Sequence, residues 1–436
     1  MALRKQFLYA LFMKIHIDLD CFFVSAERIL DPSLIGKPVG VGGRSDQHIF
    51  SKKSTQQTMS LANNGAFVMS FFQDNPSSGR NDIDKFIDQD GRVRGIFTTS
   101  SYEARNFGIK TGTTINEALQ KCPDIIVKKP NMKWYQKLSH DLHNFLRLRI
   151  PLLEQGSIDE FYGDLSGWIE DENVPAFIEA LKYEVQEKLS LPISVGAAQS
   201  KYTAKLATNE AKPFGTKTIY PNEVDAFIHN IPIGKFPGIG GKTKKRLEGY
   251  GLHTLGDIQK AKELFLHQTK STWELYQRVC GVDNTPIEKE HIRKSIGISR
   301  TFDPIRDREE ARRRLTILSR HLGFAIMRMG VIPTNFHVGV SYELREKGKA
   351  NITHNRLFSE KFFKDVSLEL FQEADSSPSL RIIRLSISTS AFTTHSHRAL
   401  SLLEYEDDQK QHKLTQGTKK LREKYGLDTL RWGCEI

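Results

Sequence analysis

Cysteine is scarce in this sequence, which has four in 436 residues: Cys21, Cys122, Cys280 and Cys434. No two of them are spaced as Cys-x-x-Cys, so neither a zinc motif nor a disulfide framework is indicated. The chain therefore fits a reducing compartment, and we expect a cytoplasmic protein.

Long apolar runs are also missing. The apolar stretch at residues 7–13 follows two basic residues, is too short to cross a bilayer and lacks a small-residue cleavage site. We expect no membrane partner. Met13 directly precedes the first expected strand, so residues 1–12 are expected to be an N-terminal extension, and the choice between Met1 and Met13 as the start stays open.

The composition is otherwise ordinary for a globular protein, with 39% hydrophobic and 26% charged residues, and the length suits two to four domains. Lys and Arg outnumber Asp and Glu by 63 to 52, which gives a formal net charge of +11 at pH 7. This excess favours a polyanionic partner such as nucleic acid, although a solvated basic surface would give the same balance.

Periodicity predicts a mixed α+β fold. Residues 14–19 alternate between apolar and polar side chains, as in a strand, and the apolar spacing then changes to that of a helix up to residue 30. The later patterns predict helices at 134–150 and 174–189, a hairpin at 156–165 and a strand at 193–197. Within residues 291–395 the patterns predict a strand at 295–302, a helix at 308–329, strands at 336–343 and 351–358, a helix at 360–373 and a strand at 380–388. This order predicts a split βαβ domain.

Residues 44–96 interrupt this pattern. They follow a glycine-rich strand at 38–43, are rich in Ser, Gln and Asn, and form a connection roughly forty residues longer than an ordinary one. Two interpretations stay open: a partly disordered insertion, or a small added subdomain.

Acidic residues gather at two predicted strand ends. Asp18 closes the first strand, and Ser157-Ile158-Asp159-Glu160 lies in the predicted hairpin. Carboxylates that meet at a sheet edge repel each other unless a cation lies between them, and hard divalent ions prefer such oxygen ligands. The alternative is that Asp18 or Asp20 only caps the following helix.

The segment Ile17-Asp18-Leu19-Asp20-Cys21-Phe22-Phe23, together with Ser157-Ile158-Asp159-Glu160, resembles the paired acidic motifs of Y-family DNA polymerases. The resemblance implies two Mg²⁺ ions, with Mn²⁺ as a substitute, and the catalytic residues Asp18, Asp159 and Glu160. These three and the Leu19 carbonyl are the expected metal ligands. Asp20 matches a position thought to be structural.

The resemblance extends to the incoming nucleotide. Tyr102-Glu103-Ala104-Arg105 resembles the family segment whose Tyr and Arg hold the triphosphate, with Thr99 and Lys212 assisting. Arg suits phosphate because its guanidinium can bond two oxygens at once. Phe22 and Phe23 are also assigned to the pocket, and the Phe23 ring is expected to exclude a ribose 2′-hydroxyl.

Expected DNA contacts lie further along the chain. The turn that contains Gly238, Gly240, Gly241 and Lys242 resembles a helix-hairpin-helix, whose backbone N-H groups approach a phosphate. Arg293, Lys294 and Ser295 begin the domain that resembles the little finger. Leu400, Leu402 and Leu403 are a candidate sliding-clamp peptide, or else part of a helix that packs on the little finger.

The resemblance implies a multidomain right-hand polymerase. Its expected parts are an extension at 1–12, palm and fingers at 13–43 and 97–230 with the insertion at 44–96, a helical thumb at 231–290, a little finger at 291–395 and a helical tail at 396–436. The expected activity is template-directed DNA synthesis from a primer 3′ end, with low fidelity, in translesion synthesis and without a proofreading exonuclease. Expected partners are primed template DNA, deoxynucleoside triphosphates and the sliding clamp, for a monomer at the bacterial nucleoid.

Two other functions compete with this one. A catalytically dead relative would act as a DNA-bound scaffold, but such proteins typically lack the acidic set that is present here. A nucleotidyl cyclase or another palm-type enzyme would need no template, and the helix-hairpin-helix turn and the basic C-terminal domain argue against such an enzyme.

Overall fold

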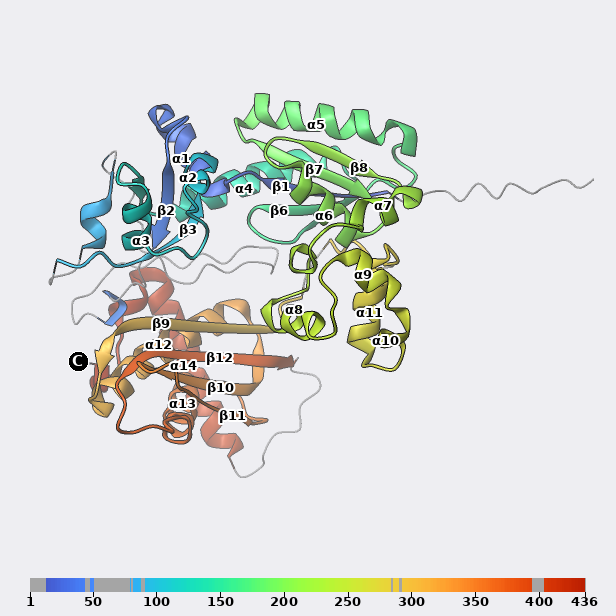
Figure 1. The fold of residues 1–436 in the computed structure, drawn as a ribbon. Coiled ribbons are helices and arrows are strands. Elements are labelled where there is room, and N and C mark those ends of the chain that lie inside the picture. The colour runs from blue at the N-terminus through green and yellow to red at the C-terminus, as the bar shows by residue number, and fades with distance from the viewer. Residues whose placement is uncertain are drawn as a thin grey trace, which may run out of the picture. The chain divides into compact units, whose positions relative to one another are not determined.

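The computed structural model describes residues 13–43, 48–50, 79, 81–87, 91–283, 285–289, 292–393 and 404–435. The chain divides into two compact units (Figure 1). Unit 1 comprises Met1–Gly42 and Pro76–His291, and unit 2 comprises Gly43–Asn75 and Ile292–Ile436. Within the described residues, no helix is long and apolar enough to cross a membrane.

A five-stranded sheet forms the centre of unit 1, in the order β5-β6-β1-β7-β8. Its strands are β1 (Lys14–Leu19), β5 (Leu152–Gln155), β6 (Glu160–Asp164), β7 (Ile193–Ala198) and β8 (Thr216–Ile219). Helix α5 (Val174–Leu189) packs on β7 and β8, and α6 (Lys201–Ala211) packs on β1, β7 and β8 (Figure 1). The helix α4 (Met132–Arg147) contacts α5 and the helix α1 (Phe22–Leu30).

Alternation along β1 explains its central place. Ile15 and Ile17 point to one face of the sheet, and His16 and Asp18 point to the other, because successive strand residues alternate. All six residues of β1 are nevertheless buried, since the sheet has structure on both faces. The predicted strand at 14–19 is confirmed, and its polar face is enclosed rather than solvated.

A smaller three-stranded sheet, in the order β3-β2-β4, belongs to the same unit. It comprises β2 (Val39–Gly43), β3 (Ile96–Ser100) and β4 (Ile126–Lys128), with the helices α2 (Tyr102–Asn106) and α3 (Ile115–Lys121). Phe97 is fully buried, and a Cβ on Gly40 would lie only 2.3 Å from its ring, which explains that glycine. Phe86 from the 44–96 segment is buried in the same core, and Asp82 N donates to Val127 O at 2.7 Å.

The last part of unit 1 is helical. It contains α7 (Val224–Ile228), α8 (Gly241–Glu248), α9 (Leu255–Lys260), α10 (Lys262–Leu266) and α11 (Lys270–Val279) around a shared apolar core. Gly238 precedes α8 with a φ of 96°, a left-handed conformation that favours glycine.

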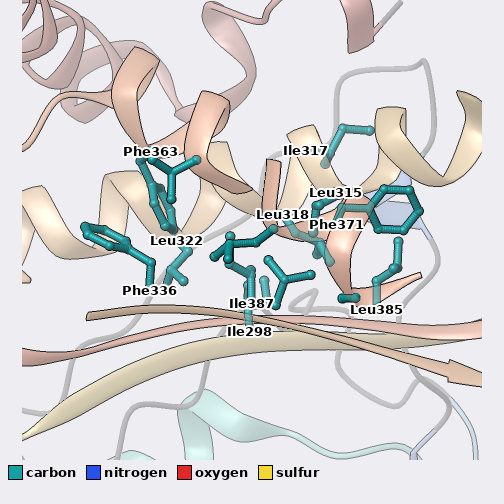
Figure 2. Packing of buried hydrophobic residues seen from close by; sticks show 14 of the residues in the cluster. Ile298, Leu315, Ile317, Leu318, Leu322, Phe336, Phe363, Phe371, Leu385 and Ile387 are labelled. Atoms are coloured by element: carbon teal, nitrogen blue, oxygen red, sulfur yellow. The ribbon is translucent and has the colours of Figure 1, made fainter. Parts of the chain in front are cut away.

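Unit 2 is built on a four-stranded antiparallel sheet, in the order β11-β10-β12-β9. Its elements are β9 (Ser295–Ile305), α12 (Arg308–Met329), β10 (Ile332–Tyr342), β11 (Lys347–Thr353), α13 (Glu360–Ala374) and β12 (Ile382–Thr393). The two helices cover one face, and their apolar side chains interlock with those of the strands (Figure 2). The predicted order of strands and helices is confirmed.

A last helix, α14 (Tyr405–Tyr425), packs on α12 and α13. Buried ion pairs hold this region: Arg320 of α12 donates to both carboxylate oxygens of Glu435 at 2.9 Å, and Arg422 of α14 lies 2.6 Å from Glu360 of α13. The candidate clamp residues Leu400, Leu402 and Leu403 lie outside the described residues.

Candidate active site

Two carboxylates face each other across neighbouring strands. The register of β1 and β6 pairs Asp18 with Glu160, so both side chains emerge on the same face of the sheet. Asp159 adjoins them in the preceding turn, where its carbonyl oxygen accepts from Leu19 N at 3.0 Å. Like charges placed directly opposite each other destabilise a sheet, which makes this pairing a feature that needs a functional reason.

Burial dominates the electrostatics of Asp18. It raises the pKa of this carboxyl from 3.8 to about 7, and the nearby carboxylates of Asp159 and Glu160 add to the rise. The ammonium of Lys212 opposes it, with Nζ 2.6 Å from Asp18 Oδ1. Burial also raises the pKa of Asp159, whose Oδ1 accepts from Ser157 Oγ at 2.5 Å.

Glu160 is held from α6. Lys205 Nζ donates to both of its carboxylate oxygens at 2.7 Å. Burial works to raise the pKa of Glu160, but the contacts with His16 and Lys205 outweigh it and hold that pKa below its ordinary value. Glu160 is therefore ionised at neutral pH.

His16 completes this face of β1. It is fully buried and lies against Tyr162 with ring centroids 4.7 Å apart, and burial lowers its pKa to about 4. His16 Nδ1 lies 2.9 Å from the Thr208 hydroxyl, and Nε2 lies 4.0 Å from Glu160 Oε2.

These side chains fit a hard divalent cation. His16, Asp18 and Glu160 each place one ligand atom within 4.8 Å of the others. Asp18 and Asp159, whose pKa values are raised by burial, would gain from a cation, because the cation offsets both desolvation and mutual repulsion. Carboxylate oxygens are the ligands that Mg²⁺ and Mn²⁺ prefer.

Asp20 has a different environment, although it lies two residues from Asp18. It is 3% exposed, and its carboxylate accepts from Tyr102 OH at 3.0 Å, Ser194 Oγ at 2.8 Å and Phe214 N at 2.7 Å. Three donors saturate most of its acceptor capacity. Asp20 thus ties the start of α2 to the five-stranded sheet.

The residues assigned to the nucleotide lie on α1, α2 and β3, apart from Lys212, which follows α6. Phe22 is buried, whereas Phe23 is partly exposed and stacks on Tyr135 with centroids 4.5 Å apart. The Arg105 guanidinium lies 4.6 Å above the Tyr102 ring, and Arg105 Nε donates to Ser100 O at 3.2 Å.

Thr99 and Lys212 complete that set. Thr99 is half-buried in β3. Lys212 follows α6 directly and bonds Asp18, so the structure brings this predicted phosphate ligand to the carboxylates.

The glycine turn before α8 is open. A Cβ on Gly238, Gly240 or Gly241 would meet no atom within 4 Å, and Lys242 is exposed. The first turn of α8 has no acidic residue, which leaves its N-terminal N-H groups suited to an anion.

In unit 2, Arg293 and Ser295 line a hollow of about 500 Å³ on the sheet. The other lining residues come from three strands: Ile296, Gly297, Asn335, His337, Ser388, Thr389 and Ser390. Lys294 is exposed beside it. Most of these side chains are polar, as a surface that contacts a nucleic-acid backbone would be.

Sequence reasoning missed Lys205 and His16. A signal existed for both. His16 precedes Asp18 by two residues and so shares its face of the strand. Lys201, Lys205 and Thr208 recur at helical spacing on α6, which places them on one side of that helix.

Three family models match the chain in order. The impB/mucB/samB family covers residues 17–209, the IMS family HHH motif covers 221–252, and the impB/mucB/samB family C-terminal domain covers 293–427. Together they span both units and support the expected fold class.

Curated relatives of the chain are DNA polymerases, in agreement with these family models. DNA polymerase IV of Actinobacillus pleuropneumoniae serotype 3 (strain JL03) is 31% identical over 291 residues, which are 66% of this chain and 69% of the relative. DNA polymerase IV 1 of Bacillus subtilis (strain 168) is 26% identical over 428 residues, 97% of this chain and 92% of the relative. A solved Y-family DNA polymerase chimera of Dbh and Dpo4 shares the fold, with a TM-score of 0.70 at 24% identity, covering 88% of this chain and 100% of the chimera.

Proposed function

The chain belongs to the Y family of DNA polymerases, and we propose that it extends a primer 3′ end by phosphoryl transfer assisted by two Mg²⁺ ions. As a DNA-directed DNA polymerase related to DNA polymerase IV, it serves translesion DNA synthesis. Low fidelity and the lack of a proofreading exonuclease are part of the proposal. The observation that carries the mechanism is the register that sets Asp18 opposite Glu160.

We assign the metal ligands to Asp18, Asp159, Glu160 and the Leu19 carbonyl. Divalent ions held there, Mg²⁺ or Mn²⁺ in its place, would lower the pKa of the primer hydroxyl and stabilise the charge that develops on the phosphate. Glu160 is ionised and fixed by Lys205, so its carboxylate is oriented before substrate arrives. Fixing it in advance reduces the reorganisation needed during reaction.

Lys212 has two partners in this proposal. It bonds Asp18, the carboxylate that the cation needs. A cation at Asp18 would free the ammonium of Lys212 to bind an incoming triphosphate beside Arg105 and Tyr102. Binding of the cation and of the nucleotide would then favour each other.

Phe23 is assigned to sugar selection. Its ring is partly exposed and is held in place by stacking on Tyr135, so it presents a rigid apolar surface. A 2′-hydroxyl against this surface would be desolvated without a hydrogen-bond partner, which disfavours ribonucleotides.

DNA binding is assigned to two regions that read no sequence. The α8 turn with Gly238, Gly240, Gly241 and Lys242 and the residues Arg293, Lys294 and Ser295 would contact phosphates. If six to ten phosphates are contacted, affinity for primed DNA falls by roughly 10³ to 10⁵ between 50 and 200 mM salt. A flat salt response would exclude this mode of binding.

Primer extension on a primed DNA template with Mg²⁺ tests the proposal. The wild type should extend the primer, and the double variant Asp159→Ala/Glu160→Ala should not. Glu187→Ala is the matched control, because Glu187 is an exposed carboxylate of the same unit. A folded, DNA-binding wild type that never extends a primer would support the scaffold instead, and conversion of a nucleoside triphosphate to a cyclic nucleotide and pyrophosphate without a template would support the cyclase.

A further inference from the structure

Part of the 44–96 segment packs in the core of unit 2, although the strand before it belongs to unit 1. Ile49 and Phe50 are 5% and 6% exposed and join the apolar cluster formed by β9, α12 and their neighbours. Burying two large apolar side chains removes their apolar surface from water, which favours this placement.

Both the ring and the backbone of Phe50 are bound. The ring meets Phe302 of β9 edge-on, with centroids 5.8 Å apart and planes at 85°. The Arg314 guanidinium lies 5.0 Å from the Phe50 ring centroid and 4.5 Å from that of Phe302. Arg313 donates to Phe50 O at 3.1 Å.

Arg313 also connects this segment to the end of the chain. It donates to Glu435 O at 3.0 Å, while Glu435 bonds the buried Arg320. The site for Phe50 is therefore shaped by β9 and α12, which are consecutive in the chain, and by the C-terminal residues, which are distant from both in sequence.

We propose that Phe302, Arg313 and Arg314 form a docking surface for residues 48–50, and that the docked segment is a second tether between the two units. β2 ends at Gly43, and six Cα steps from there to Ile49 span at most about 20 Å. Without docking, the 36 steps from Gly43 to Gly79 would only lead back to unit 1, because residues 76–291 belong to that unit. Docking therefore turns this connection within unit 1 into a tether to unit 2 that spans at most about 20 Å.

Cutting the other connection tests the tether. A protease site placed after His291, where unit 1 ends, divides the folded chain into residues 1–291 and 292–436, and co-elution on a sizing column then reports whether the fragments stay bound. The cut wild type should stay together. In Ile49→Ala/Phe50→Ala we expect the fragments to bind at least about 100-fold more weakly, because truncating buried apolar side chains loses that much binding.

Phe107→Ala is the matched control, because its ring is 52% exposed in unit 1, and its fragments should co-elute like those of the wild type. If the double alanine variant does not fold, the single variants Phe50→Leu and Arg314→Gln replace it in the same experiment. Each should weaken the association of the two fragments while hydrogen exchange along β10 and β12 is unchanged. Fragments of the cut wild type that separate, or variant fragments that stay together as tightly as the wild type, would overturn the proposal.

Discussion

Asp18 and Asp20 are two residues apart and should respond oppositely to the same substitution in metal-free buffer. Asp18→Asn should stabilise the fold at pH 8, whereas Asp20→Asn should destabilise it. The reason is that Asp18 lies among other carboxylates, while Asp20 accepts hydrogen bonds from three donors.

The magnitude for Asp18 follows from its pKa. The folded protein raises that pKa from 3.8 to about 7, and each pH unit is worth about 1.4 kcal/mol, so ionised Asp18 lowers stability by up to about 4 kcal/mol. That pKa already includes the attraction of Lys212, so the expected net gain for Asn at pH 8 is at most about 4 kcal/mol. The wild type loses this stability as pH rises from about 4 through 7, so the gain should vanish at pH 4 and be complete at pH 8.

The magnitude for Asp20 follows from its three donors. A hydrogen bond to a charged group is worth about 1.5–3 kcal/mol, and an asparagine keeps one oxygen but turns an N-H₂ group toward a donor. We expect a loss of about 2–4 kcal/mol, together with a weaker hold on Tyr102.

Urea unfolding in EDTA, followed by hydrogen exchange of the β1 amides, measures both effects at pH 4 and pH 8. Asp124→Asn is the control, because Asp124 is an exposed carboxylate in unit 1. An Asp18→Asn protein that is destabilised at pH 8 as much as Asp20→Asn would refute the argument that burial and repulsion dominate at Asp18.

Three further outcomes are expected. Mg²⁺ binding should release close to one proton at pH 6 and almost none at pH 8.5, because the pKa of Asp18 is about 7. Calorimetry in two buffers of different ionisation enthalpy counts the released protons. An equal count at both pH values would contradict this prediction. Lys205→Gln should lower kcat in primer extension by about tenfold or more with little change in the KM for DNA, because Lys205 orients Glu160. A change confined to KM would show that Lys205 acts in DNA binding instead. Glu435→Gln should destabilise unit 2 by about 3–5 kcal/mol, since it breaks a buried pair with Arg320; a loss below about 1 kcal/mol in urea unfolding would show that the pair is dispensable.

Local signals were sufficient for several elements. Helix α12 was expected at 308–329 and lies at Arg308–Met329, because an aspartate caps its start and Gly330, with a φ of 66°, ends it. The strand at 14–19 followed from alternation alone. The predicted strand at 351–358 was displaced, since β11 ends at Thr353 and Ser359 then caps α13.

For the candidate site too, some features followed from local sequence and others only from the tertiary structure. The sequence by itself determined that Asp18 ends a strand and that Asp159 and Glu160 lie in a hairpin, because both patterns are local. Only the tertiary structure decided that β1 and β6 pair in the register that sets Asp18 opposite Glu160, and that Lys205 and Lys212 reach them from α6 and its end.

Burial and long-range docking also came from the tertiary structure alone. The raised pKa of Asp18 depends on the packing of distant segments around it, and no property of its neighbours in the chain sets that packing. Ile49 and Phe50 are an apolar pair in a polar segment, and the sequence does not say which core they enter. Strand alternation and helix caps are written in adjacent residues, whereas register, burial and docking depend on contacts between residues far apart in the chain.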